Sequence, residues 1–217
     1  MRAAGVEARL ELWVVDPGDW SRLRGGGGVA RREALRRRAH RGVVQWEVGG
    51  GWLTTEHGDH SGALDVWCKQ FSTTSYCTRL TAEVLRRESS TPLRKDWRLF
   101  ITGSAFAIKD ITVESFSVPH DAVEPVGFAF YAGASALGYI TDLGQATRLT
   151  IERLRQVETL MIETNHDEKL LQNDPHRPWP VKQRIQSRHG HLSNTAAAAV
   201  VEQLLAGKLA RVVLGHL

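Results

Sequence analysis

Residues 54–60, which read Thr-Thr-Glu-His-Gly-Asp-His, constrain this chain more than any other part of its sequence. Two histidines and an aspartate, His57, Asp59 and His60, fall within four residues, shortly after the apolar Leu53. Neutral imidazole and carboxylate oxygen are ligands for zinc, manganese or iron, so a turn at the end of a strand could aim all three side chains at one ion. The alternative is a polar surface loop that happens to contain histidines, because short motifs also arise by chance.

Four later segments share one feature: a histidine or an aspartate follows a short apolar or β-branched run. They read Val-Pro-His-Asp-Ala (118–122), Ile-Thr-Asp-Leu-Gly (140–144), Glu-Thr-Asn-His-Asp (163–167) and Gly-His-Leu-Ser-Asn (190–194). The chain then ends with Val-Val-Leu-Gly-His-Leu (212–217). A polar side chain after such a run lies at the end of a strand, which is the position expected for a ligand.

In this order the segments resemble the metallo-β-lactamase-fold hydrolases, and within them the bacterial exonuclease-like phosphodiesterase branch. The resemblance extends from about Trp52 to Leu217 and is most specific from Ser117 onward. It implies an α/β fold, a four-layer αββα sandwich with the metal ions at one sheet edge. In the family, further chain follows the segment that corresponds to His216 and closes the fold, so we expect a hydrolase domain over residues 51–217 that is incomplete at its C-terminus.

The resemblance also implies a set of metal ligands. His57 and His120 would hold one divalent ion, while Asp59, His60 and His216 would hold a second, with Asp142 bridging both. Zinc and manganese are the expected metals. Asp59 would also orient the attacking hydroxide, and His191 would be a second catalytic residue near the substrate. The implied substrate-binding residues are His166 and Asn194, although a hydrogen-bonded histidine in a packed loop is an equal alternative for His166 and for His191.

One departure from the family motif concerns the first metal position. The motif is His-x-His-x-Asp-His, and Thr55 stands where its first histidine belongs. A threonine hydroxyl is a weak replacement for imidazole, so we expect weak occupancy of that position. We also expect that a histidine at position 55 would raise both occupancy and activity.

These observations favour a metal-dependent hydrolase of phosphodiesters, with nucleic acid as the expected partner. A formal net charge of +4 mildly supports an anionic partner. Arg184 and Arg188 could contact a nucleic-acid backbone, but a solvated helix face is the simpler interpretation. Two alternatives stay open: hydrolysis of another ester or a lactam at the same centre, and a non-catalytic, degenerate remnant of the fold.

Residues 1–50 form an N-terminal segment that is expected to be divergent and partly flexible. Gly25 to Gly28 predict a linker rather than a phosphate-binding loop, because no Lys-Ser or Lys-Thr pair follows. An arginine-rich run at 31–38 could be a nucleic-acid-binding patch, but it is more typical of a solvated helix face or of disorder. Asp16 could correspond to an early aspartate of the family near the metals, and a solvated turn is its alternative.

The remaining sequence features set broad limits. A length of 217 residues with 42% hydrophobic content is typical of one globular domain. Two cysteines without CxxC spacing argue against a disulfide framework or a cysteine zinc site. We see no membrane-spanning run or signal peptide, so a cytoplasmic location is expected. The oligomeric state is left open.

Hydrophobic patterning predicts a layered α/β architecture, because strands and helices alternate in the second half of the chain. The predicted strands cover residues 9–16, 52–55, 97–101, 111–118, 126–131, 137–141, 160–163 and 211–214. The predicted helices cover residues 61–71, 78–87, 148–157, 181–188 and 196–205, and either Ser193 or Asn194 is expected to cap the last of them.

Overall fold

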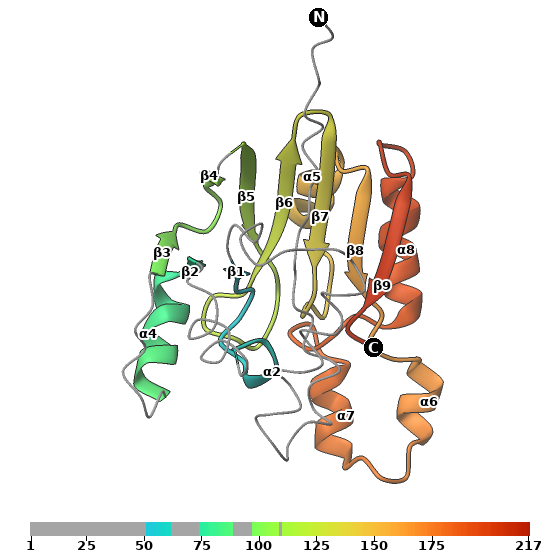
Figure 1. Ribbon diagram of the computed structural model, residues 1–217. Helices are drawn as coiled ribbons and strands as arrows, with labels where there is room; N and C mark the ends of the chain where they lie inside the picture. Colours follow the sequence, from blue (N-terminus) through green and yellow to red (C-terminus); the bar gives the residue numbers. More distant parts are fainter. Residues whose placement is uncertain (1–50, 62–73, 89–96, 109) are drawn as a thin grey trace, which may run out of the picture.

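The computed structural model describes residues 51–61, 74–88, 97–108 and 110–217, and these residues contain two β-sheets (Figure 1). The smaller sheet is parallel and has the order β1 (Gly51–Trp52), β2 (Ser75–Thr78), β3 (Trp97–Phe100). Helix α4 (Arg79–Glu88) follows β2 and packs on this sheet through a small apolar cluster of Leu53, Cys77, Ala82 and Leu85.

The larger sheet has six strands whose spatial order follows the sequence. Neighbouring strands are antiparallel from β4 to β7, whereas β7, β8 and β9 are parallel to one another. The strands are β4 (Ala105–Ile108), β5 (Ile111–Ser117), β6 (Val126–Ala132), β7 (Ser135–Ile140), β8 (Thr159–Glu163) and β9 (Arg211–Gly215). Five further helices are described: α2 (Gly58–Ser61), α5 (Arg148–Leu154), α6 (Glu168–Asn173), α7 (Trp179–Ile185) and α8 (Asn194–Leu204).

Alternating side chains of the larger sheet bury apolar surface on both of its faces. Phe128 and Phe130 of β6 face the smaller sheet, where they pack in one cluster with Tyr76 and Phe100. The opposite face packs against α5 and α8 in a second cluster, which contains Phe116, Ile140, Leu154, Leu160, Ile162, Val200 and Leu204. The order of layers is therefore helix, sheet, sheet, helix, as the resemblance to the metallo-β-lactamase-fold hydrolases implies.

Side-chain caps explain where two helices of the outer layer begin. Thr147 accepts a hydrogen bond from the backbone of Thr150 and forms a capping box at the start of α5. Ser193 caps α8 by accepting from the backbone N–H of Ala196, so Ser193 rather than Asn194 is the cap. None of the helices in the described part of the chain is both long enough and apolar enough to span a membrane.

Most predicted elements from residue 97 onward are present, with ends that shift by a few residues. The strand predicted over 52–55 is shorter, because pairing with β2 ends at Trp52. Strands β2 and β4 and helices α2 and α6 were not predicted, since all four are short and lack a clear apolar period. The strand predicted at 9–16, Asp16, the features of residues 1–50 and nearly all of the helix at 61–71 lie outside the described residues.

Candidate metal centre

One edge of the larger sheet gathers the polar residues that follow its strands. The parallel strands β7, β8 and β9 all end at this edge, and β5, which is antiparallel to β6, ends there too. His120 follows β5, Asp142 follows β7 and His216 follows β9. The loop that begins at Thr54 reaches the same edge, because its carbonyl oxygen accepts a hydrogen bond of 3.0 Å from the N–H of Val126 at the start of β6.

The carboxylate of Asp142 lies at the centre of the histidines and is 1% exposed. Its Oδ2 lies 2.8 Å from His60 Nε2, and its Oδ1 lies 3.3 Å from His216 Nε2 and 3.7 Å from His120 Nε2. Burial by itself would raise the pKa of Asp142, but the hydrogen bond from His60 and the neighbouring imidazoles hold that pKa well below its usual range. The residue is therefore an anion that faces three imidazole nitrogens.

His57 and His120 form a first pair of donors beside Asp142. His57 Nδ1 lies 3.3 Å from His120 Nε2. On the other side of its ring, His120 Nδ1 lies 3.0 Å from the carbonyl oxygen of Gly190. Because a carbonyl only accepts, Nδ1 carries the proton and Nε2 presents its lone pair toward the site. Burial lowers the pKa of His120, which favours the neutral imidazole that a metal ion requires.

Asp59, His60 and His216 form a second group, with one donor atom from each residue within 4.8 Å of the others. His60 Nε2 lies 3.6 Å from Asp59 Oδ2, while its Nδ1 lies 2.9 Å from Thr54 Oγ1. The contact with Thr54 fixes the orientation of the ring, so Nε2 points at the carboxylates. All six predicted metal ligands therefore lie in one region of the molecule.

The spacing of these donors fits divalent cations. A tetrahedral ion with bonds of about 2.0–2.1 Å to nitrogen keeps its ligand atoms about 3.3–3.4 Å apart. The pair of His57 and His120 is separated by 3.3 Å, and so is the pair of His216 and Asp142. Oδ1 of Asp142 lies near His120 of the first pair and His216 of the second group, whereas Oδ2 lies near His60, so this carboxylate faces both groups. The donor set of neutral imidazoles and carboxylates therefore fits a pair of ions, one near each group.

Thr55 is fully buried and does not replace an imidazole as a donor. Its Oγ1 accepts a hydrogen bond of 3.3 Å from the backbone N–H of His57. The hydroxyl therefore stabilises the turn that presents His57. The first pair of histidines has no third imidazole from this position.

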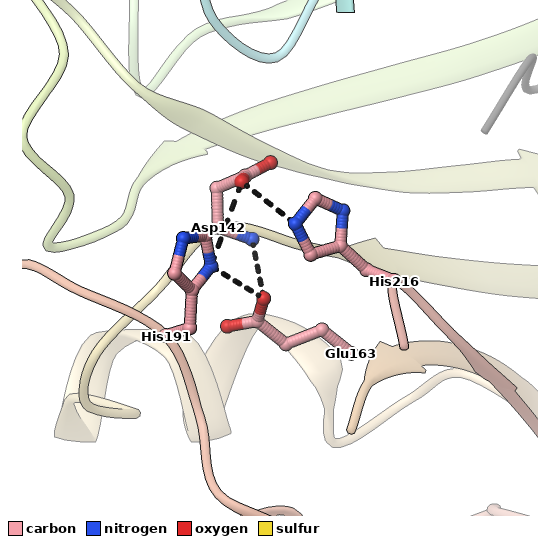
Figure 2. Close-up of side chains that lie close together, drawn as sticks. All are labelled: Asp142, Glu163, His191 and His216. Carbon is pink, nitrogen blue, oxygen red and sulfur yellow. Dashed lines mark hydrogen bonds and ion pairs between the residues drawn. The ribbon is translucent and has the colours of Figure 1, made fainter. Parts of the chain in front are cut away.

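Glu163, the last residue of β8, is a functional residue that the sequence analysis missed. Figure 2 shows its carboxylate beside Asp142, His191 and His216. It is fully buried and accepts backbone N–H bonds from Asp142 at 3.2 Å, Leu143 at 3.0 Å and Leu192 at 2.8 Å. Glu163 thus ties the loop after β7 to the loop that carries His191. A glutamate directly before the Thr-Asn-His segment was its only signal in the sequence.

His191 lies against both carboxylates of Figure 2. Its Nδ1 is 3.1 Å from Glu163 Oε2 and 3.8 Å from Asp142 Oδ1. Burial would lower the pKa of His191, but the hydrogen bond to Glu163 and the charges of both carboxylates raise it above its usual value. The raised pKa favours a proton on His191, in contrast to His120, whose pKa is lowered by burial.

A family model described as "Beta-lactamase superfamily domain" matches residues 14–217. The chain belongs to this superfamily. The resemblance inferred from the sequence motifs is confirmed, and so is the αββα fold class. The match also begins upstream of the expected boundary at residue 50.

Proteins similar to this superfamily member agree with that assignment. "Exodeoxyribonuclease YycJ" of Bacillus anthracis is 30% identical over 171 residues, which cover 79% of this chain and 64% of the relative. The chain thus spans less than two thirds of the length of that relative. Two solved structures share the fold. The metallo-β-lactamase fold protein YhfI of Bacillus subtilis is 14% identical with a TM-score of 0.62, and the match covers 84% of this chain and 70% of YhfI. Zn²⁺-bound PqqB of Methylobacterium extorquens is 19% identical with a TM-score of 0.58, and the match covers 77% of this chain and 62% of PqqB.

The two substrate-binding residues expected for this superfamily member lie next to the centre. The backbone N–H of Asn194 donates to the carbonyl oxygen of His166 at 2.8 Å, so the two residues are linked. Burial lowers the pKa of His166. The exposed Asn194 also lines an apolar groove of about 620 Å³ between α8 and β9. Among the residues that the structure describes, His166 is in none of the groups of histidines, cysteines and carboxylates that could hold a metal ion.

The side chains of Arg184 and Arg188 donate hydrogen bonds to the loops that follow β5 and β7. Arg184 Nε donates to Asp121 Oδ2 at 2.5 Å, and Arg188 Nε donates to Gln145 Oε1 at 3.1 Å. Both side chains stay exposed, so these bonds lie on a solvated surface. Together they join α7 and the residues after it to the loops that follow β5 and β7.

Two residues of the candidate metal centre have an unusual backbone conformation. In the part of the chain that the structure describes, the only non-glycine residues with positive φ are Asp142, at 55°, and His216, at 52°. Aspartate and histidine tolerate this left-handed conformation better than most residues do. Both candidate ligands thus project from sharp turns at the ends of β7 and β9.

Proposed function

We propose that this chain is a metal-dependent hydrolase that cleaves phosphodiester bonds in DNA. The convergence of His57, His60, His120 and His216 on the buried carboxylate of Asp142 carries this proposal. Support for DNA as the substrate comes from the similar protein of Bacillus anthracis, which is named an exodeoxyribonuclease. The net charge of +4 suits a polyanion.

In this proposal His57 and His120 hold one divalent ion, whereas Asp59, His60 and His216 hold the other. Asp142, whose carboxylate faces both groups, would be the ligand that the two ions share. Bound zinc or manganese ions supply an acidified water for the attack on phosphorus and positive charge for the phosphoryl oxygens. The hydrogen bonds of His120 to Gly190 and of His60 to Thr54 keep the donor nitrogens aimed at the centre.

Two residues have proposed catalytic roles beyond ligation. Asp59 is half exposed and lies 3.6 Å from His60 Nε2, so its carboxylate can orient a water molecule and accept its proton. His191 holds a proton through its hydrogen bond to Glu163, and it can place that positive charge against a phosphate or donate the proton to the departing oxygen. His166 and Asn194 are proposed to contact the part of the substrate that lies outside the metal centre.

Cleavage of an aryl phosphodiester in the presence of manganese or zinc tests the proposal. The matched control is Asp142→Asn, because asparagine has the same shape and tolerates the positive φ of this position. We expect wild-type activity to depend on added metal and to fall by at least about 10²-fold in the control, since the shared ligand carries the charge that holds both ions. Equal activity in the two proteins would favour a non-catalytic remnant.

A second assay separates the substrate classes. The wild type should shorten end-labelled DNA and leave a thioester and a β-lactam intact under the same conditions. Hydrolysis of the thioester or the lactam without DNA cleavage would move the assignment to the other ester or lactam substrates. Cleavage of DNA labelled at either end also identifies the direction of attack.

A further inference from the structure

Asp121, which lies next to His120 in the sequence, completes a third group of potential ligands. Its Oδ1 lies 3.4 Å from His120 Nε2. One donor atom each from His57, His120 and Asp121 lies within 4.8 Å of the others. This third group contains the first pair of histidines, His57 and His120, to which Thr55 adds no imidazole.

The second oxygen of Asp121 is fixed by the protein. Arg184 Nε donates a hydrogen bond to Oδ2, and the backbone N–H of Asp121 donates to the carbonyl oxygen of His189 at 3.0 Å. Oδ1 is therefore the oxygen that faces the histidines. A carboxylate whose outer oxygen is held in this way resembles a metal ligand that is oriented by a hydrogen-bonding neighbour.

We infer that Asp121 is a protein ligand of the first metal position and replaces the imidazole that Thr55 does not supply. This inference depends on the proposed two-metal function. The separations of 3.3 Å from His57 to His120 and 3.4 Å from His120 to Asp121 are the spacings of ligands around one tetrahedral ion. With Oδ1 of Asp142, the first position has two nitrogen and two oxygen donors.

The exchange of a nitrogen donor for a carboxylate oxygen changes the metal preference of this position. Oxygen ligands suit manganese better than an imidazole does, whereas imidazole suits zinc. The ratio of zinc affinity to manganese affinity at the first position should therefore be smaller in the wild type than in the Thr55→His variant. Competition between the two metals, followed by metal analysis of the dialysed protein, measures this ratio without an activity assay.

Cobalt spectroscopy of a cysteine variant tests the ligand directly. In Asp121→Cys, a thiolate at position 121 should bind Co²⁺ and produce a thiolate-to-cobalt charge-transfer band in the near ultraviolet. Ala122→Cys is the matched control, because it places a thiol one residue away from the proposed ligand. The wild type supplies the baseline from its own cysteines. The band is expected in Asp121→Cys and absent from the other two proteins.

A double-mutant cycle tests the replacement. Asp121→Asn should weaken binding of the more weakly held ion by more than about 10-fold, as measured by calorimetric titration. The same substitution made together with Thr55→His should have a smaller effect, because the restored imidazole takes over the position.

The outcomes separate this inference from the proposed function. A wild type that binds no cobalt refutes both. If the wild type binds cobalt but Asp121→Cys shows no charge-transfer band, Asp121 is only the hydrogen-bond partner of Arg184 and the inference fails alone. If the double variant does not fold, the band in the single variant decides.

Discussion

Replacement of Glu163 by glutamine should destabilise the metal-free protein, although the two side chains have almost the same shape. The carboxylate accepts three backbone N–H bonds and the Nδ1–H of His191. Oε1 receives the N–H groups of Leu143 and Leu192, so a glutamine oxygen can keep that pair. The NH2 group of glutamine would then replace Oε2, so the N–H of Asp142 and the Nδ1–H of His191 would both lose their acceptor.

The magnitude follows from the groups that lose their partner. A buried donor without an acceptor costs about 1–3 kcal/mol, so the lost bond from Asp142 and the lost bond from His191 together cost about 2–6 kcal/mol. Alanine would leave all four donors unsatisfied, the three backbone N–H groups and the Nδ1–H of His191, and cost about 4–12 kcal/mol by the same reasoning. Because a domain is stable by only about 5–15 kcal/mol, glutamine is the variant that should still fold.

Urea denaturation in the presence of a chelator measures this effect without a contribution from metal binding. The control is Glu158→Gln, since Glu158 is one-third exposed and pairs with Arg211 at the surface. Its substitution should cost less than about 1 kcal/mol. If Glu163→Gln lowers the free energy of unfolding no more than the control does, Glu163 does not hold the two loops together.

Three further results are expected. Thr55→His should raise the affinity of the first metal position and the rate of phosphodiester cleavage, as calorimetric titration and the aryl phosphodiester assay will show; unchanged affinity would contradict the role assigned to position 55. Gly144→Ala should lower the free energy of unfolding by about 1–3 kcal/mol or more, because a Cβ atom there would lie 2.1 Å from the carbonyl oxygen of Ser187; a thermal melt that matches the wild type would exclude this close approach. NMR titration of the metal-free protein should find the pKa of His191 above its usual value, because the hydrogen bond to Glu163 outweighs burial. In Glu163→Gln the pKa of His191 should be lower than in the wild type. The stability that this hydrogen bond adds is fully present below the pKa of an unfolded histidine and is lost as the pH rises through the pKa of the folded protein. A pKa that does not change on substitution would mean that Glu163 does not set it.

The sequence indicated candidate ligands at strand ends because each of them follows an apolar run, and the resemblance to the metallo-β-lactamase-fold hydrolases implied which of them meet at the centre. His120, Asp142 and His216 occupy equivalent places after three strands, and parallel strands end at one edge of a sheet. The same reasoning places His57 and His60 after the first short strand. Hydrophobic patterning also predicted both outer helices, α5 and α8, since each has a regular apolar face.

The connections between the loops could not be predicted in this way. Glu163 resembles any last residue of a strand, and its function depends on N–H groups that are 20 and 29 positions away in the sequence, in Leu143 and Leu192. The pairing of Asp121 with Arg184 likewise depends on how α7 lies against the loop after β5. Such contacts are set by the packing of whole elements, and no local period in the sequence records them.

The hydrogen bonds that join His120 to Gly190 and His60 to Thr54 separate metal loading from folding. In small zinc-dependent domains the ion is the scaffold, so chelation unfolds them. Here the donors are already oriented by the polypeptide, and an ion needs only to enter. Whichever cation is abundant and small enough would then load first, so the cellular supply of metals, and not the folding reaction, would determine which form of the protein is present.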